Sequence, residues 1–198
     1  YAPDGVATGA LHIADDPDLT AIPDATYDVV LSSHVIEHLA DPLRALAAWR
    51  RATCPGGHLL LIAPHMEGTF DHRRDVTTLA HLCADRDAAV TEDDLTHLDE
   101  TLQLHDRNRD AEGGDQEMWA QRRRDNATTR VLHHHVFTTA SLAELLQEAG
   151  LELLAVETRH PHDIYVLGRW GDGTASALEP LADALRTSPF RRDRKGAR

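Results

Sequence analysis

The sequence predicts an α/β protein organised around one strand–helix–strand unit, and three observations in residues 27–65 support this. An apolar run at Tyr27–Ser33 contains adjacent valines and is typical of a strand buried on both faces. Asp41-Pro42 marks the start of a helix. A second apolar run, residues 59–63, follows turn-forming residues. Because the unit takes fewer than 40 residues, we expect a parallel strand pair with a right-handed crossover.

The helix inside this unit has clear signals at both ends. Asp41 is a good N-cap residue, and Pro42 suits the first turn, where its missing N–H leaves no hydrogen bond unmade. Four apolar residues then recur at helical spacing: Leu39, Leu43, Leu46 and Trp49. The Pro-Gly-Gly at residues 55–57 predicts that the helix ends and the chain turns before the second strand.

The segments before and after this unit differ in character. Upstream, residues 11–14 predict a short strand, and residues 15–28 an acidic loop. Downstream, residues 66–130 are polar, and they predict helices over residues 78–89, 92–105 (with a capping box of Thr91 and Asp94) and 116–126. We expect residues 66–130 to be a helical lid that shapes a substrate pocket. A solvated decoration, or a contact in a homo-oligomer, is the alternative.

Residues 131–170 return to the core. Thr138 is the expected N-cap of an amphipathic helix over residues 140–149. Strands are expected at residues 151–157 and 164–170, and their short connection requires an antiparallel pair. Residues 171–198 form a tail with one short helix at residues 178–186. Its basic end, with five basic residues and one acidic residue in residues 191–198, is expected to be disordered.

Composition excludes several classes of function. The chain has 198 residues, is 41% hydrophobic and carries a formal net charge of −13, so its body would repel nucleic acid. No apolar run approaches the roughly 18 residues of a membrane span. The two cysteines, Cys54 and Cys83, are far apart in sequence and are expected to be free thiols, as in a reducing cytoplasm.

Residues 27–65 resemble the fourth to fifth strand of class I S-adenosylmethionine-dependent methyltransferases of the small-molecule branch. Four features carry the resemblance: Tyr27-Asp28 at the strand start, Glu37-His38 near its end, Asp41-Pro42 at the helix start and Pro55-Gly56-Gly57. Residues 137–157 resemble the last helix and sixth strand of that family. The resemblance implies a Rossmann-like sheet containing strands 4, 5, 6 and 7, of which the last is antiparallel.

The sequence departs from the pattern of that family in its cofactor-binding segment. The family binds its cofactor with a glycine-rich turn after the first strand, and no Gly-x-Gly precedes Tyr27. Only 26 residues precede the matching strand, whereas three strands and three helices need on the order of 80. We therefore expect residues 1–170 to be a methyltransferase-like domain whose N-terminal half is missing from this sequence. A non-catalytic binding or scaffold protein is the alternative.

Most of the expected functional residues lie at the carboxyl end of the strand expected at residues 27–33, where open α/β sheets bind ligands. The resemblance implies that Asp15, Ser32, Ser33 and His34 contact S-adenosylmethionine, with Asp15 near the adenine. His34 is also the expected catalytic base for methyl transfer to a small molecule, because the pKa of histidine suits that work.

The sequence contains 14 histidines, which raises the possibility of a divalent metal. The resemblance implies that Glu37 and His38 are its candidate ligands. His65, His72 and His135 are expected to face the substrate cleft or lid, and with Asp71 they form a second candidate set for a metal or an acidic substrate. A metal-dependent enzyme that uses these histidines is therefore a further alternative, although no Cys-x-x-Cys supports zinc.

Overall fold

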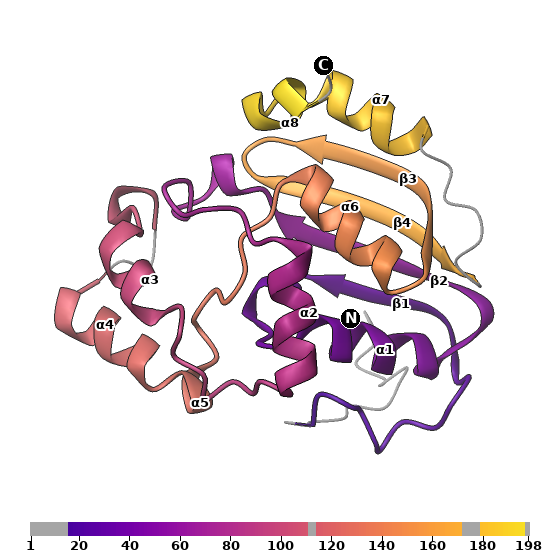
Figure 1. The fold of residues 1–198 in the computed structure, drawn as a ribbon, viewed down its shortest axis with the longest axis horizontal. Helices are drawn as coiled ribbons and strands as arrows, with labels where there is room; N and C mark the ends of the chain where they lie inside the picture. The colour runs from indigo at the N-terminus through magenta and orange to yellow at the C-terminus, as the bar shows by residue number, and fades with distance from the viewer. Residues whose placement is uncertain (1–15, 111–113, 172–178, 197–198) are drawn as a thin grey trace, which may run out of the picture.

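A computed structural model describes residues 16–110, 114–171 and 179–196 (Figure 1). The strand expected at residues 11–14, and Asp15, lie outside the described residues. The centre is a four-stranded sheet in the order β1-β2-β4-β3. Its members are β1 (Tyr27–Ser33), β2 (Thr53–Pro64), β3 (Leu151–Arg159) and β4 (Asp163–Trp170). β1 and β2 are parallel, whereas β4 runs antiparallel to β2 and β3, which confirms the predicted fold class.

The connection from β1 to β2 is the predicted crossover helix, α1 (Pro42–Ala52). The side chain of Asp41 caps it, with Oδ1 accepting a hydrogen bond from Arg44 N at 2.9 Å. The Pro-Gly-Gly segment is part of β2 rather than a turn before it. A Cβ at Gly57 would lie 2.8 Å from the carbonyl oxygen of Asp28, so glycine lets the two strands approach where their register shifts.

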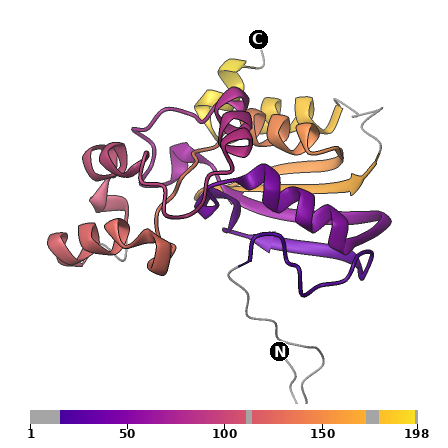
Figure 2. The same ribbon diagram turned by 60° about the horizontal axis from the view of Figure 1, so that its bottom comes forward.

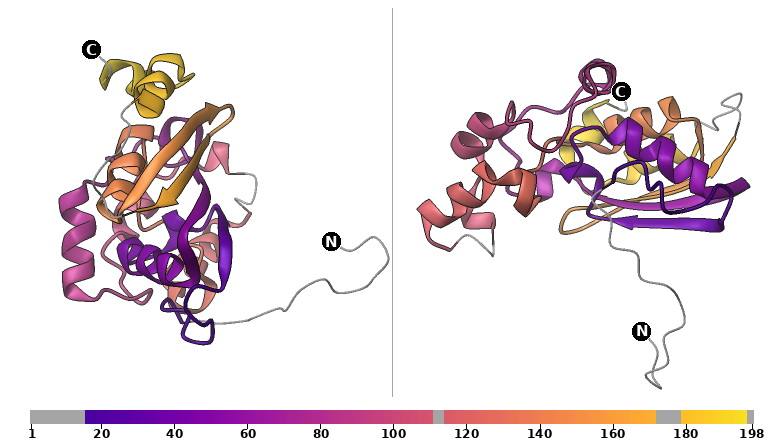
Figure 3. Two further views of the ribbon diagram at one scale, coloured as in Figure 1. Left: turned by 90° about the vertical axis from the view of Figure 1, so that its right-hand side faces the viewer. Right: turned by 90° about the horizontal axis from the view of Figure 1, so that it is seen from below.

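Helices α1, α2 (Leu79–Ala88) and α6 (Thr139–Glu148) lie on one face of the sheet (Figures 1 and 3). The core between them is aliphatic, and Leu46, Leu59, Leu61 and Leu142 are all fully buried there. α6 begins with the predicted Thr138 cap. Thr138 and Ser141 form a capping box, in which the side chain of each accepts a hydrogen bond from the backbone N–H of the other. These interactions fix the carboxyl ends of β1 and β2 beside the start of α1.

The expectation that β1 is buried on both faces is wrong. Val29 is 54% exposed and Leu31 is 65% exposed, because β1 is an edge strand within the described residues and no helix there covers these side chains. Leu31 is in register with Leu60, and Leu60 with Leu167, so an apolar row crosses the open face. Burial depends on what pairs with a strand, which its own residues cannot reveal.

Residues 66–130 form a mainly helical lobe, whose first helix, α2, packs with α1 and α6 and whose other helices lie beside the sheet (Figures 1 and 2). It contains α2, α3 (Leu98–Leu104), α4 (Gln116–Arg124), α5 (Asn126–Thr129) and two 3₁₀ turns, η2 (Met66–Gly68) and η3 (Arg107–Arg109); a further turn, η1 (Ile36–His38), precedes α1. The capping box predicted at Thr91 and Asp94 is absent. Thr91 bonds Asp93, and Asp94 accepts from Thr96. Because these side chains compete for local hydrogen bonds, α3 begins at Leu98 instead of residue 92.

The C-terminal segment contains α7 (Glu179–Thr187) and α8 (Arg191–Gly196), so the end expected to be disordered is helical through residue 196. Asp193, the single acidic residue of α8, anchors this helix to the rest of the fold. Asp193 is buried and accepts hydrogen bonds from His65 Nε2 at 3.2 Å, Thr139 Oγ1 at 2.6 Å and Ser188 Oγ at 2.6 Å. Phe190 stacks on the His65 ring. The prediction of disorder from net charge is therefore wrong for residues 191–196.

Two further features of the described residues bear on the composition. Cys54 and Cys83 are free and half-buried. None of the helices that the structure describes combines the length and apolar character needed to cross a bilayer.

We predict that Asp193→Ala lowers the free energy of unfolding by about 3 kcal/mol, because the substitution leaves the buried groups of His65, Thr139 and Ser188 without their acceptor. Urea unfolding followed by circular dichroism measures this change. Asp183→Ala, which removes an exposed acidic side chain of α7, is the control and should change stability by less than about 0.5 kcal/mol. Equal effects of the two substitutions would show that α8 is not anchored through Asp193.

Candidate functional site

The chain leaves β1 through His34, which adopts a left-handed backbone conformation with φ of 51°. This conformation is uncommon outside glycine, and it marks the position as structurally constrained. His34 N donates to Ile62 O at 2.9 Å, which holds the end of β1 against β2. The side chain is thereby turned toward a cavity of 530 Å³. This cavity is the crevice expected at the carboxyl end of the strand.

The cavity has an apolar wall and a polar rim. The apolar wall comprises Pro17, Leu19, Val35, Leu39, Ala45 and Trp49. The polar rim comprises Asp16, His34, His38, Glu92 and Arg130. Glu92 and Arg130 form an ion pair at 2.6 Å, and both come from the lobe of residues 66–130. The lobe therefore contributes charged side chains to the cavity, which sequence reasoning missed because neither residue lies near His34 in the chain.

Two carboxylates flank the His34 imidazole. Glu37 Oε1 lies 3.5 Å from Nδ1, and Asp163 Oδ1 lies 3.3 Å from Nε2. The interaction with Glu37 raises the pKa of His34 above 6.5, although partial burial opposes it. Burial would raise the pKa of Glu37, but its pairing with His34 and the nearby His133 outweigh burial and lower it. An imidazole whose pKa is raised toward neutrality suits general base catalysis.

Glu37 also meets two further histidines. One ligand atom from each of Glu37, His38 and His133 lies within 4.8 Å of the others. Burial lowers the pKa of His38 to about 4, and its Nδ1 lies 3.3 Å from Leu132 O, so the ring is neutral and Nε2 faces Glu37. Glu37 Oε2 is buried with no hydrogen-bond partner among the described residues. The pair expected as metal ligands is thus brought together, with His133 as an unexpected third member.

The residues expected to bind the cofactor differ in their exposure. Ser32 is buried, and its Oγ has no hydrogen-bond partner within the described part of the chain. Ser33 is exposed at the strand end. Both line a second hollow of 410 Å³ beside β1. Asp15 is outside the described residues, while the neighbouring Asp16 lines the His34 cavity. A buried hydroxyl without a partner fits a polar ligand atom, so Ser32 retains its candidate role.

The three histidines expected at the substrate cleft do not meet there. His65 is fully buried, where Nε2 bonds Asp193 and Nδ1 accepts from Glu67 N. His72 Nε2 lies 2.9 Å from Asp106 Oδ2 within the lobe. His135 is buried near Ala40. The expectation that these residues face one cleft is therefore wrong, because each is paired by a segment distant in sequence.

The second candidate ligand set, which joined these three histidines to Asp71, is not assembled either. Asp71 Oδ2 lies 2.6 Å from His133 Nδ1. Burial would raise the pKa of Asp71, but His133 and Arg74 outweigh burial and hold it at about 2. Asp71 is thus an anion that orients His133, and through His133 it borders the Glu37 site.

Arg74 holds the lobe against residues 133–135. Its side chain is 1% exposed. Nη1 bonds Asp71 Oδ1 at 3.2 Å and His133 O at 2.8 Å, and Nη2 bonds Glu100 Oε1 at 2.6 Å. One buried cation therefore pairs with carboxylates from two parts of the lobe and with the backbone of the segment that precedes α6.

The model of a family described as "Methyltransferase domain" matches residues 6–156. No sequence match was found among curated proteins.

Solved structures give further matches. A methyltransferase dependent on S-adenosylmethionine (SAM) from Aquifex aeolicus is 12% identical, with a TM-score of 0.44 over 80% of this chain and 54% of that one. A SAM-dependent methyltransferase from Thermotoga maritima, described as a possible histamine N-methyltransferase, is 14% identical, with a TM-score of 0.41 over 78% of this chain and 61% of that one. One from Mesorhizobium loti is 19% identical, with a TM-score of 0.48 over 84% and 72%. The chain thus spans less than two thirds of the first two.

We predict that Arg74→Met lowers the free energy of unfolding by about 3–5 kcal/mol, because it leaves buried Asp71 without its cation and releases Glu100. Urea unfolding measures the change. Arg73→Met is the matched control, since Arg73 is half-exposed and pairs with Asp106 at 3.1 Å; it should cost less than about 1 kcal/mol. A loss no larger than that of the control would contradict the proposed role of Arg74.

We also predict that Glu37→Gln lowers the pKa of His34, measured by NMR titration of the imidazole Hε1 signal. In the native protein the pKa should exceed 6.5, because the Glu37 carboxylate favours the imidazolium. The substitution removes that charge while burial still favours the neutral ring. Glu148→Gln, an exposed change on α6, should leave the pKa unchanged.

The same pair predicts how stability depends on pH. The raised pKa of His34 means that its contribution is complete below pH 6.5 and is lost as pH rises through the folded-state value. The lowered pKa of Glu37 means that its contribution is present above pH 4.5 and is lost in acid. Glu37→Gln should therefore cost more stability at pH 5.5 than at pH 8.5. An equal cost at both values would show that the pair is not ionic.

Proposed function

Because the chain belongs to the methyltransferase-domain family, we propose that it carries out methyl transfer from S-adenosylmethionine to a small molecule bound in the cavity beside His34. The observation that carries this proposal is the cavity itself. It opens at the end of β1, where the family match and the strand order favour a ligand, and it holds a histidine with a raised pKa. A volume of 530 Å³ suits a small molecule rather than a polymer.

The walls indicate the chemistry of the acceptor. Leu39, Ala45 and Trp49 offer an apolar surface for a hydrocarbon or aromatic ring. The ion pair of Glu92 and Arg130 offers a carboxylate and a guanidinium at the rim, which suits an acceptor with a polar or charged substituent. We therefore infer that the lobe of residues 66–130 acts in substrate selection, as a partial lid over this cavity.

His34 is the proposed base. The acceptor atom, an oxygen or a nitrogen, would lose its proton to the neutral imidazole as its lone pair forms the new bond to the methyl carbon. S-adenosylmethionine supplies that carbon as a sulfonium, whose carbon–sulfur electron pair remains on sulfur. Glu37 and Asp163 would stabilise the imidazolium and hold the ring in position. The remaining contribution of the chain is to align the reactants and to exclude water.

Ser32 and Ser33 would contact the cofactor in the 410 Å³ hollow beside β1, with the unpartnered Ser32 hydroxyl as the donor. Asp15 remains a prediction for the adenine. A divalent metal at Glu37 and His38 also remains a prediction; it would act by orienting the acceptor. The residues that line the His34 cavity would form the acceptor side of the proposed site.

The proposal is tested by calorimetric titration of the native protein with S-adenosylhomocysteine, followed by an acceptor screen in which release of that product is measured. We expect saturable binding and turnover with at least one amine, phenol or carboxylic acid. His34→Gln should lower kcat by about 10²–10⁴-fold and leave the Kd for S-adenosylhomocysteine within threefold. His58→Gln, in β2 and away from the cavity lining, should change neither quantity.

Failure to bind S-adenosylhomocysteine would overturn the proposal. Binding without turnover on any acceptor would instead favour the non-catalytic alternative, in which the protein binds the cofactor or a partner without chemistry. Retention of full activity by His34→Gln would remove His34 as the base while leaving methyl transfer in place.

A further inference from the structure

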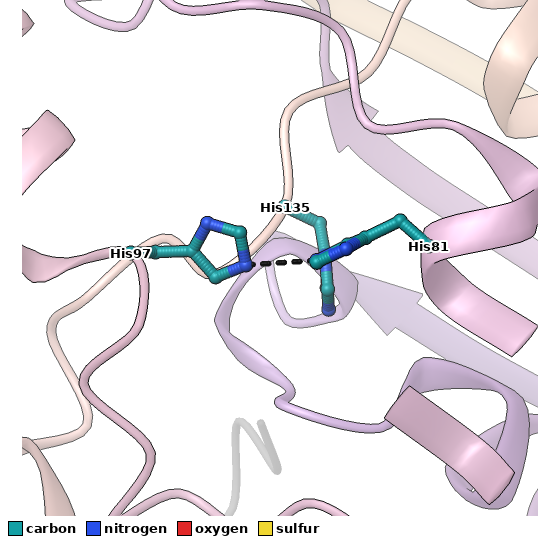
Figure 4. Close-up of side chains that lie close together, drawn as sticks. All are labelled: His81, His97 and His135. Carbon is teal, nitrogen blue, oxygen red and sulfur yellow. Dashed lines mark hydrogen bonds between the residues drawn. The ribbon is translucent and has the colours of Figure 1, made fainter. Parts of the chain in front are cut away.

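Three histidines from separate elements converge at the junction of α2, α3 and residues 131–137 (Figure 4). His81 lies on α2, His97 precedes α3, and His135 precedes α6. One nitrogen from each ring lies within 4.8 Å of the others, and the Nε2 atoms of His81 and His97 are 3.0 Å apart. None of the three lines the His34 cavity.

Two of these rings are oriented by a second partner. His97 Nδ1 lies 3.0 Å from Glu100 Oε1, so that nitrogen carries the proton and Nε2 keeps its lone pair. His135 Nε2 lies 3.2 Å from Ala40 O, and its buried Nδ1 makes no hydrogen bond with any described residue. A histidine whose other nitrogen donates to a carboxylate or a carbonyl is the arrangement that surrounds metal ions in proteins.

A carboxylate lies beside two of the three rings. Asp85, one helical turn after His81, places Oδ2 at 3.3 Å from His81 Nε2 and 4.0 Å from His135 Nε2. This oxygen is buried and, within the described residues, has no hydrogen-bond partner. The direct contact between His81 and His97 satisfies neither Asp85 Oδ2 nor His135 Nδ1. A cation among these groups would give the buried oxygen a partner.

We propose that His81, His97 and His135, with Asp85, bind one divalent ion of the zinc type. Three imidazoles and one carboxylate favour Zn²⁺ or Co²⁺ over Mg²⁺ and Ca²⁺, which prefer oxygen ligands. Ligands at about 2.0–2.1 Å around a tetrahedral ion are about 3.3 Å apart, which is close to the spacing between His81 and its two neighbours. Small side-chain shifts complete the coordination.

The site is structural rather than catalytic. With Asp85 as fourth ligand no position is left open for a substrate, and the site lies outside the cavity that holds His34. The ion joins α2 to the residue before α3 and to the segment that leads into α6. It therefore fastens the lobe of residues 66–130 to the sheet domain. This inference does not depend on methyl transfer, and its test needs no activity measurement.

The test uses the native protein purified without a polyhistidine tag and stripped of metal with a chelator. Titration with Co²⁺ should give the visible absorption of a four-coordinate ion, with one equivalent of that absorption dependent on His81 and His97. Titration with Zn²⁺ should displace it and raise Tm by about 5–10 °C. His81→Gln and His97→Gln should weaken Co²⁺ binding by about 100-fold or more and abolish the Tm shift. Both side chains are partly exposed, so these variants should fold.

Three further variants separate this site from its rivals. Glu100→Gln, which removes the carboxylate behind His97, should weaken Co²⁺ binding by about 10-fold. His133→Gln, in the group with Glu37 and His38, and His72→Gln should leave binding unchanged. Metal binding that survives His81→Gln and His97→Gln but is lost in His133→Gln would overturn the proposal. Absence of a saturable Co²⁺ absorption that depends on His81 and His97 would overturn it equally.

Discussion

Two groups of polar side chains depend on the buried guanidinium of Arg74: Glu37, His38 and His133 form one group, and His81, His97 and His135 form the other. The guanidinium contacts Asp71, which orients His133 toward Glu37 and His38. It also contacts Glu100, which orients His97 toward His81 and His135. Because buried Asp71 and partly exposed Glu100 share one cation, removal of Arg74 would disturb the orientation of both histidine sets. The carboxyl end of β1 and the three-histidine cluster are thus joined by one charge network.

This network holds the lobe of residues 66–130 in a fixed position relative to residues 133–135. A lobe held by apolar contacts alone could slide, whereas charge-assisted hydrogen bonds fix its position and its distance from β1. That position brings Glu92 and Arg130 to the rim of the cavity beside His34. The position of the cavity wall therefore depends on hydrogen bonds from Arg74 to the backbone of His133 and His134, which do not line the cavity.

The features that the sequence predicted correctly are those with local causes. The cap of α1 at Asp41, the cap of α6 at Thr138 and the antiparallel β3–β4 pair each follow from a few neighbouring residues. The failures have distant causes: the exposure of Val29 depends on what pairs with β1, and the partner of His65 comes from α8. His34 follows the end of β1, as the sequence indicates, but the carboxylate of Asp163 beside it was not predicted, because Asp163 belongs to β4.

The position of β1 places a constraint on the proposed chemistry. His34 lies at the end of a strand that pairs with β2 alone in the described sheet, and Val29 and Leu31 are exposed on it. Ligand crevices of open α/β sheets form between neighbouring strands that lead their helices to opposite faces. One wall of such a crevice is present here, made by α1, η1 and the lobe. Within the described residues no strand lies against the outer edge of β1, so the opposite wall of such a crevice is not among them.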